Sequence, residues 1–175
     1  MTSVWLRQFE RVPFLVSDTS VIIDLDRGDL LEAAFELDDS LVVPDLLFER
    51  ELDADFGERL RSLGIVIESL DGSEVRRATQ LRRGEPRLSV ADTFAFALAQ
   101  GRQWTLLTGD GVLRSIAEAE GIAVHGVLWV FDRIEANRIC DAATLHGCLS
   151  KTAAHPRCRL PRREIELRLK RYSGR

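Results

Sequence analysis

The stretch that decides the fold runs from Arg87 to Gly111 and reads RLSVADTFAFALAQ, then GRQ, then WTLLTGDG. Its first part has the apolar content of a buried helix, and its last part predicts a short strand followed by the start of a second helix. Asp92 lies in the first turn of the buried helix, and Asp110 lies just after the strand. Two acids in such positions need a chemical reason, and two further acids elsewhere in the chain have a similar setting.

Outside this stretch, short apolar runs alternate with helical patterns along the whole chain. The predicted strands cover residues 14–17, 41–43, 65–67, 104–107 and 122–124. One helix is expected to start at Pro44 and to run to about Leu63, where Gly64 ends it. Such alternation is typical of a parallel sheet covered on both faces. The sequence therefore predicts an α/β fold, a three-layer α/β/α sandwich with a mainly parallel central sheet.

Length and composition indicate an ordinary globular chain. The 175 residues fit one domain with a full core, and 45% of them are hydrophobic. No apolar run is long enough for a transmembrane helix, and the N-terminus lacks the features of a signal peptide, so no membrane contact and a cytoplasmic location are expected. The three cysteines are odd in number and late in the chain, which does not indicate a disulfide framework.

Charge is distributed unevenly along the chain. The net charge is −4, but residues 151–175 hold nine Lys or Arg and two Asp or Glu, so the remainder carries about −11. An acidic body argues against passive coating of nucleic acid, but not against an enzyme that grips phosphates locally and through metal ions. The expected organisation is one domain over residues 1–150 and a basic C-terminal helical extension over residues 151–175.

Ligands of an open α/β sheet bind beyond the carboxyl ends of the strands. Asp18 directly follows the first predicted strand, and Asp110 follows the fourth. Asp92 begins the helix that leads into the fourth strand, and Glu49 lies on the helix after the second. We therefore expect Asp18, Glu49, Asp92 and Asp110 to meet at one edge of the sheet.

On a helical projection, Glu49 and Glu51 lie on different sides of the expected helix. An apolar stripe on this helix consists of Phe48, Leu52, Phe56, Leu60 and Leu63. Glu49 falls about 40° from the centre of the stripe and Glu51 about 120° away on the other side. The projection predicts that Glu49 faces inward, where an acid needs a partner, and that Glu51 borders solvent.

Helix capping is an alternative explanation for three of these acids. Asp18 and Asp110 suit N-cap positions, and Ser89 with Asp92 has the pattern of a capping box. Capping and metal binding are compatible, however, because both place a carboxylate at the start of a helix. Four converging carboxylates would repel one another without a cation, and Mg²⁺ or Mn²⁺ prefers such oxygen ligands. A site of this kind commonly activates water for attack on phosphate.

Four stretches of the chain resemble the four motifs of the PIN-domain ribonucleases. They are VSDTSVIIDL at 16–25, VVPDLLFEREL at 42–52, LSVADTFA at 88–95 and LLTGDGVL at 106–113. The resemblance implies a metal-dependent endoribonuclease that uses Mg²⁺ or Mn²⁺ to cleave RNA. It also implies kinship with toxins of the VapC kind, which pair with an antitoxin protein, and makes a homodimer plausible.

The same resemblance assigns roles to individual residues. Asp18, Glu49, Asp92 and Asp110 would form the acidic metal site, with Ser20 and Thr108 as hydrogen-bonding residues behind it. The second motif carries acids at both 49 and 51, so Glu51 remains an alternative to Glu49.

Two questions about substrate and function stay open in the sequence. Five arginines before the third motif are candidates for binding RNA phosphates, although a solvated helix face explains them equally well. They are Arg76, Arg77, Arg82, Arg83 and Arg87. The alternatives to a nuclease are a non-catalytic PIN-like module that binds RNA or protein, and an aspartyl-phosphate hydrolase. The latter commonly needs a second Asp two residues after the first, where this chain has Ser20.

Overall fold

The computed structural model describes residues 13–52 and 54–174. Its centre is a five-stranded sheet in which every pairing is parallel and the strand order is β3-β2-β1-β4-β5. The strands are β1 (Phe14–Ser17), β2 (Ser40–Pro44), β3 (Val66–Glu68), β4 (Thr105–Leu107) and β5 (Val124–His125). Since β1 pairs with β2 on one side and with β4 on the other, the strand order reverses between β1 and β4. Such a switch point is where open α/β sheets bind their ligands.

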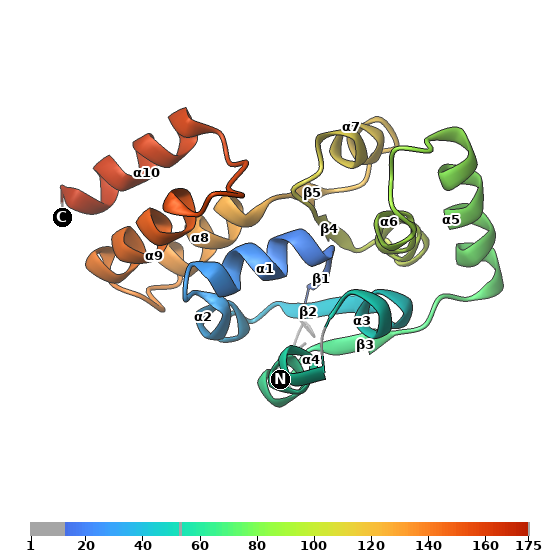
Figure 1. The fold of residues 1–175 in the computed structure, drawn as a ribbon, viewed down its shortest axis with the longest axis horizontal. Helices are drawn as coiled ribbons and strands as arrows, with labels where there is room; N and C mark the ends of the chain where they lie inside the picture. Colours follow the sequence, from blue (N-terminus) through green and yellow to red (C-terminus); the bar gives the residue numbers. More distant parts are fainter. Residues whose placement is uncertain (1–12, 53, 175) are drawn as a thin grey trace, which may run out of the picture.

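Helices cover both faces of the sheet, as Figure 1 shows. One layer contains α1 (Thr19–Arg27), α2 (Leu31–Phe35), α8 (Val127–Ala136), α9 (Ala142–Ala154) and α10 (Arg162–Ser173). The opposite layer contains α5 (Gly72–Gly84), α6 (Val90–Arg102) and α7 (Gly111–Ala119). Two short helices, α3 (Asp45–Glu51) and α4 (Ala54–Leu63), connect β2 to β3. The predicted three-layer α/β/α sandwich is confirmed.

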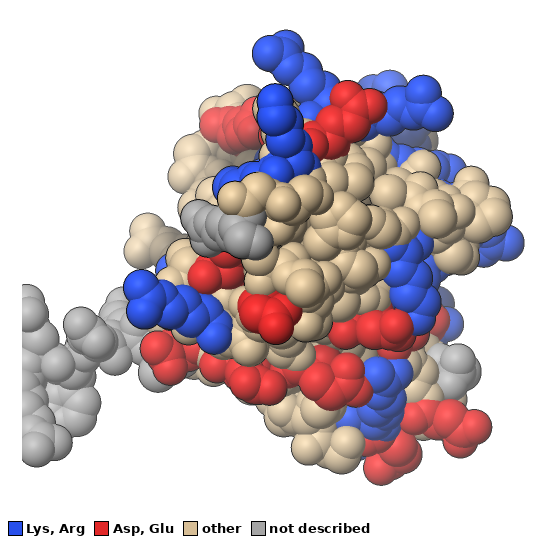
Figure 2. Space-filling view, turned by 90° about the vertical axis from the view of Figure 1, so that its left-hand side faces the viewer, with Lys and Arg blue, Asp and Glu red and all other residues tan. Residues whose placement is uncertain are grey.

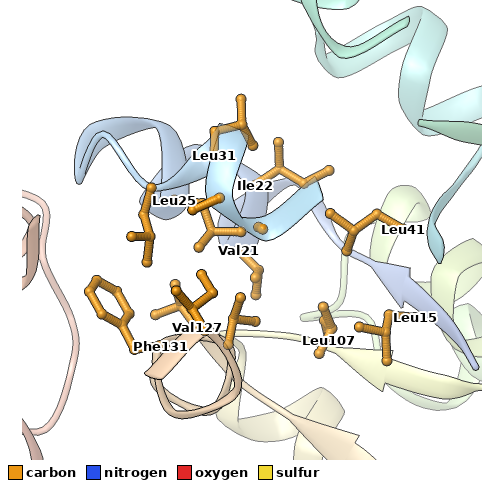
Figure 3. Close-up of a cluster of buried hydrophobic side chains, with 14 of the residues drawn as sticks. Leu15, Val21, Ile22, Leu25, Leu31, Leu41, Leu107, Val127 and Phe131 are labelled. Atoms are coloured by element: carbon orange, nitrogen blue, oxygen red, sulfur yellow. The ribbon is translucent and has the colours of Figure 1, made fainter. Parts of the chain in front are cut away.

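The strands supply alternate side chains to two separate hydrophobic cores. Leu15 and Leu107 face the core under α1 and α8, which Figure 3 shows in close-up. Val16 and Leu106, the neighbours of these residues in sequence, face the core under α6. Side chains of a strand point alternately to its two faces, so a strand buried on both sides must be apolar throughout. Burial on both faces holds β1 and β4 in place. It therefore also positions the acids that follow their carboxyl ends.

The expectation of one helix from Pro44 to Leu63 is wrong. The chain is extended at Leu52, where φ is −104° and ψ is 131°, and a second helix begins at Ala54. The break lets the two helices fold against each other: a Cβ added at Gly57 would lie 3.2 Å from the ring of Phe48. Nine residues of continuous helix would hold these two residues about 13 Å apart along the axis.

The basic C-terminal segment forms a packed helix. Ile165 and Tyr172 of α10 are buried, while Arg168 lies 2.5 Å from Asp132 on α8. Arg171 also contacts Asp132, at 2.7 Å. Figure 2 shows this side of the molecule with basic side chains gathered in its upper part, over α10, and acidic side chains mainly in its lower half.

The predicted domain boundary at residue 150 falls within α9, and α9 packs against α1, α8 and α10. None of the helices in the described part of the chain is both long and apolar enough to cross a membrane.

Candidate active site

Asp18 is the most buried acid of the candidate site. It follows β1 directly, caps α1, and is only 3% exposed. Its Oδ1 accepts hydrogen bonds from the Ser20 hydroxyl at 2.7 Å and from the backbone N–H of Val21 at 3.0 Å. Its Oδ2 accepts a hydrogen bond from the Thr108 hydroxyl at 2.5 Å. Both carboxylate oxygens are therefore held by the protein, and the side chain is fixed in direction.

Burial raises the pKa of Asp18 above the ordinary value of an aspartate, because it penalises the charged form. The three hydrogen bonds act in the opposite direction, since they favour the carboxylate, and the charge of nearby Asp92 raises the pKa further. Asp18 is therefore buried, hydrogen-bonded and repelled by a second acid. In such an environment a bound cation would stabilise the charged carboxylate.

Thr108 connects the ends of β1 and β4. The residue is fully buried; its hydroxyl donates to Asp18 and accepts a hydrogen bond from the backbone N–H of Asp110 at 3.0 Å. The backbone N–H of Gly109 in turn donates to the Ser20 hydroxyl at 3.3 Å. A Cβ at Gly109 would lie 2.9 Å from that hydroxyl oxygen, so a larger residue would push the Ser20 hydroxyl out of its present position. The structure thus places Ser20 and Thr108 where the motif match predicts them, in contact with Asp18.

Asp92 and Asp110 both serve as helix-start residues, and each keeps one carboxylate oxygen free of described partners. Asp92 accepts through Oδ2 from the backbone N–H of Ser89 at 2.8 Å, within a capping box that begins α6. Asp110 caps α7 and accepts through Oδ1 from the backbone N–H of Leu113 at 2.8 Å. Within residues 13–52 and 54–174, Asp92 Oδ1 and Asp110 Oδ2 accept no hydrogen bond. Capping thus leaves an oxygen of each residue for another ligand.

These three acids line one open cleft of about 1080 Å³ at the switch point of the sheet. Glu51 lines the same cleft and accepts a hydrogen bond from the hydroxyl of Thr19, at the start of α1. The acidic wall therefore contains Asp18, Glu51, Asp92 and Asp110; Asp24 of α1 also lines the cleft and is paired with Arg27 at 3.2 Å.

The inward orientation predicted for Glu49 is wrong. Its side chain is exposed, and it borders a separate small hollow together with Asp45 and Phe94. The helical projection failed because it carried one apolar stripe through Leu52, where the helix ends. Of the two acids in the second motif, the structure brings Glu51 to the other three and leaves Glu49 apart.

The five arginines proposed for phosphate binding do not line the cleft. Arg77 is paired with Glu120 at 2.6 Å, and Arg87 with Glu85 at 2.7 Å. Arg82 donates to the backbone carbonyl of Pro86, and Arg76 and Arg83 are exposed on α5, in the layer opposite α1.

The basic residues that do line the cleft are Arg27 of α1 and Arg157 and Arg159 of the α9–α10 connection. Sequence reasoning missed all three; Arg157 and Arg159 could not be placed because their position depends on how α9 packs against α1. The basic character of residues 151–175 was visible in the sequence, but its location in the fold was not.

The donor chemistry of the acidic wall fits a hard divalent cation, because Mg²⁺ and Mn²⁺ prefer carboxylate oxygens. Among the described residues, no three acidic, histidine or cysteine side chains are arranged to hold an ion as they stand. The free oxygens of Asp92 and Asp110 and the fixed carboxylate of Asp18 are the donors present, and the more exposed side chains would have to rotate to bind one ion together.

Comparison with known families agrees with this architecture. A family model described as a PIN domain matches residues 14–173, which is nearly the whole described chain. The chain belongs to the PIN-domain family. Members of this family are generally nucleases and typically use divalent metal ions. Among curated proteins, none matches the chain in sequence.

Proposed function

We propose that the chain is a metal-dependent endoribonuclease that hydrolyses RNA phosphodiester bonds. The observation that supports this most strongly is the buried carboxylate of Asp18 at the switch point, with Asp92, Asp110 and Glu51 on the same wall. A non-catalytic binding module need not keep a cluster in which burial and a second acid raise the pKa of Asp18. Such a cluster is costly in the folded protein unless it holds a cation.

The roles of individual residues follow from their contacts. Thr108 and Ser20 hold Asp18 in one orientation, so Asp18 would be the fixed ligand of the metal. Asp92, Asp110 and Glu51 are more exposed and would adjust around the ion. A bound divalent ion supplies activation of water and stabilisation of the departing oxygen in phosphodiester hydrolysis. The Thr108 hydroxyl donates to Asp18 and accepts from the backbone N–H of Asp110, and these two hydrogen bonds together link the ends of β1 and β4 and so the two acids.

A toxin role, with an antitoxin partner and a homodimer, is proposed from the motif resemblance. Co-expression with the product of a neighbouring reading frame would test the partner, and light scattering of the purified protein would test the dimer. Growth arrest on expression, relieved by the neighbouring product and lost in a catalytic variant, would support the toxin role.

The test of the catalytic proposal is cleavage of a mixed RNA panel with Mg²⁺, Mn²⁺ or chelator. Asp110→Asn removes the charge of one acid of the cleft and retains an oxygen that can cap α7. Asp141→Asn is its matched control, because Asp141 caps α9 in the same way, accepting from Thr144 N–H at 2.7 Å, but lies outside the cleft. Metal-dependent cleavage should be lost in the first variant and kept in the second.

The other outcomes discriminate between the remaining functions. A folded wild type that cuts no RNA with either metal would contradict the proposal and favour the non-catalytic module. Equal activity of the Asp110→Asn and Asp141→Asn variants would mean that the acids of the cleft do not carry the reaction.

A further inference from the structure

The cleft has a second wall, formed by residues 156–160, which connect α9 to α10. These residues read Pro156-Arg-Cys-Arg-Leu160, and Pro161 follows. Cys158 and Leu160 are partly buried and pack against the hydrophobic core, while Arg157 and Arg159 are exposed. All five residues line the cleft, and Cys158 and Leu160 also anchor the segment to the core.

Several contacts give this segment a defined shape. The backbone N–H of Cys158 donates to the carbonyl of His155 at 2.9 Å, and the backbone N–H of Arg157 donates to Nδ1 of His155 at 3.2 Å. Prolines at both ends restrict the backbone further. The two arginines thus extend from a turn that is already ordered, which reduces the entropy lost when they bind a ligand.

The charges of this wall are not neutralised by the protein. Among the described residues, the side chains of Arg157 and Arg159 form no ion pair or hydrogen bond, although acidic side chains line the same cleft. Two arginines of α10 differ in this respect, because Arg168 and Arg171 are both paired with Asp132. The two guanidinium groups are unpaired and line an open cleft that also has an acidic wall. An anionic ligand could therefore bind between the arginines and the acidic wall.

We propose that Arg157 and Arg159 bind backbone phosphates of the RNA strand that lies in this cleft. The inference rests on the proposed ribonuclease function, since it names the residues that hold the substrate of the same site. A phosphodiester backbone is repelled by the acidic wall, and cations on the opposite wall offset that repulsion for the phosphates next to the scissile one. Guanidinium groups suit this role because they donate two parallel hydrogen bonds to phosphate oxygens.

The experiment measures binding without cleavage. A short labelled single-stranded RNA of mixed sequence is titrated with the protein in chelator at low salt, and fluorescence anisotropy gives the Kd. The variant is Arg157→Ala with Arg159→Ala. The matched control is Arg162→Ala with Arg163→Ala, because these two arginines are also exposed and without described partners but lie on α10 outside the cleft.

The cleft variant should weaken binding about tenfold and lower the slope of log K against log salt by about 1.4, as expected for two lost contacts to single-stranded phosphates. The control should stay within about twofold, because exposed charges outside the contact act only weakly. Replacing both cleft arginines by lysine should restore most of the affinity and the slope but lose bidentate contacts. Equal Kd values for wild type and cleft variant, or no binding by the wild type, would overturn the inference.

Two further outcomes separate this inference from the catalytic proposal. Binding that depends on Arg157 and Arg159 in a protein that cuts no RNA would sustain the inference and refute the catalytic proposal. Cleavage by wild type with unchanged KM in the cleft variant would do the opposite. Tighter binding or faster cleavage after removal of the arginines would also overturn the inference, because it would show that the segment obstructs the site. The unfolding temperature of each variant checks that the exposed substitutions leave the fold intact.

Discussion

Replacement of Thr108 by valine removes one hydroxyl from the interior at nearly constant shape. That hydroxyl donates to the buried Asp18 at 2.5 Å and accepts from the backbone N–H of Asp110 at 3.0 Å. A hydrogen bond to an ionised group is worth roughly 1.5–3 kcal/mol, and a backbone donor left without its partner costs about 1 kcal/mol when half-buried. The added methyl group recovers part of this loss through apolar burial. We expect a net loss of about 2–3 kcal/mol in the free energy of unfolding at pH 8.

The assay is urea and thermal denaturation of metal-free protein at pH 8, with Thr108→Ser as the control that keeps the hydroxyl. A chain of this size loses roughly 2–4 °C in Tm for each kcal/mol, so the valine variant should melt about 4–12 °C lower than wild type. The serine variant loses only a buried methyl group and should be destabilised by about 1 kcal/mol. If valine costs no more than serine, the Thr108 hydroxyl does not support the buried carboxylate, and the account of the site fails.

Three further predictions concern the acids and the C-terminal helix. Glu51→Gln should lower metal-dependent cleavage roughly tenfold or more, as expected for loss of a metal ligand. Glu49→Gln should change cleavage less than about twofold. The reverse order of effects would show that Glu49 is the acid of the site, as the helical projection predicts. Asp92→Asn should stabilise the metal-free protein. Because the pKa of Asp18 is raised in the folded protein, the stability that Asp18 contributes is fully present below the ordinary Asp pKa and is lost as pH rises through the folded pKa. Removing the charge of Asp92 lessens that loss, so the stabilisation by Asp92→Asn should grow with pH over the same window. A gain that is independent of pH in denaturant titrations would contradict this linkage. Asp132→Asn should cost about 1–2 kcal/mol in urea denaturation, because it leaves two arginines of α10 without their shared carboxylate. An unchanged midpoint would show that the ion pairs of Asp132 do not stabilise the helix.

The sequence was most informative where one local pattern determined the position of a residue. Asp18 and Asp110 each follow a buried strand, and strands of a parallel sheet end at a common edge, so their meeting followed from the topology. Asp92 could be placed beside them because Ser89 defines the start of α6 and therefore the position of its third residue. In these cases the capping chemistry and the site chemistry coincide.

The sequence was less informative where position depends on packing between distant segments. The predicted orientation of Glu49 assumed a helix that continues past Glu51, where the chain instead turns and brings Gly57 close to Phe48. Arg157 and Arg159 reach the cleft because α9 packs against α1, more than a hundred residues earlier in the chain. No local periodicity encodes such a contact.

The close contact of Ser20 with Gly109 makes the residues that can occupy these two positions depend on each other. With only 2.9 Å between the serine oxygen and a Cβ built at residue 109, an alanine at 109 would displace the Ser20 hydroxyl. Either rotation of that hydroxyl or a smaller residue at 20 would relieve the contact, and both would remove the hydrogen bond from Ser20 to Asp18. Sequences that share this fold should therefore change the two positions together, and the change should be rarest where the acids of the cleft are all retained.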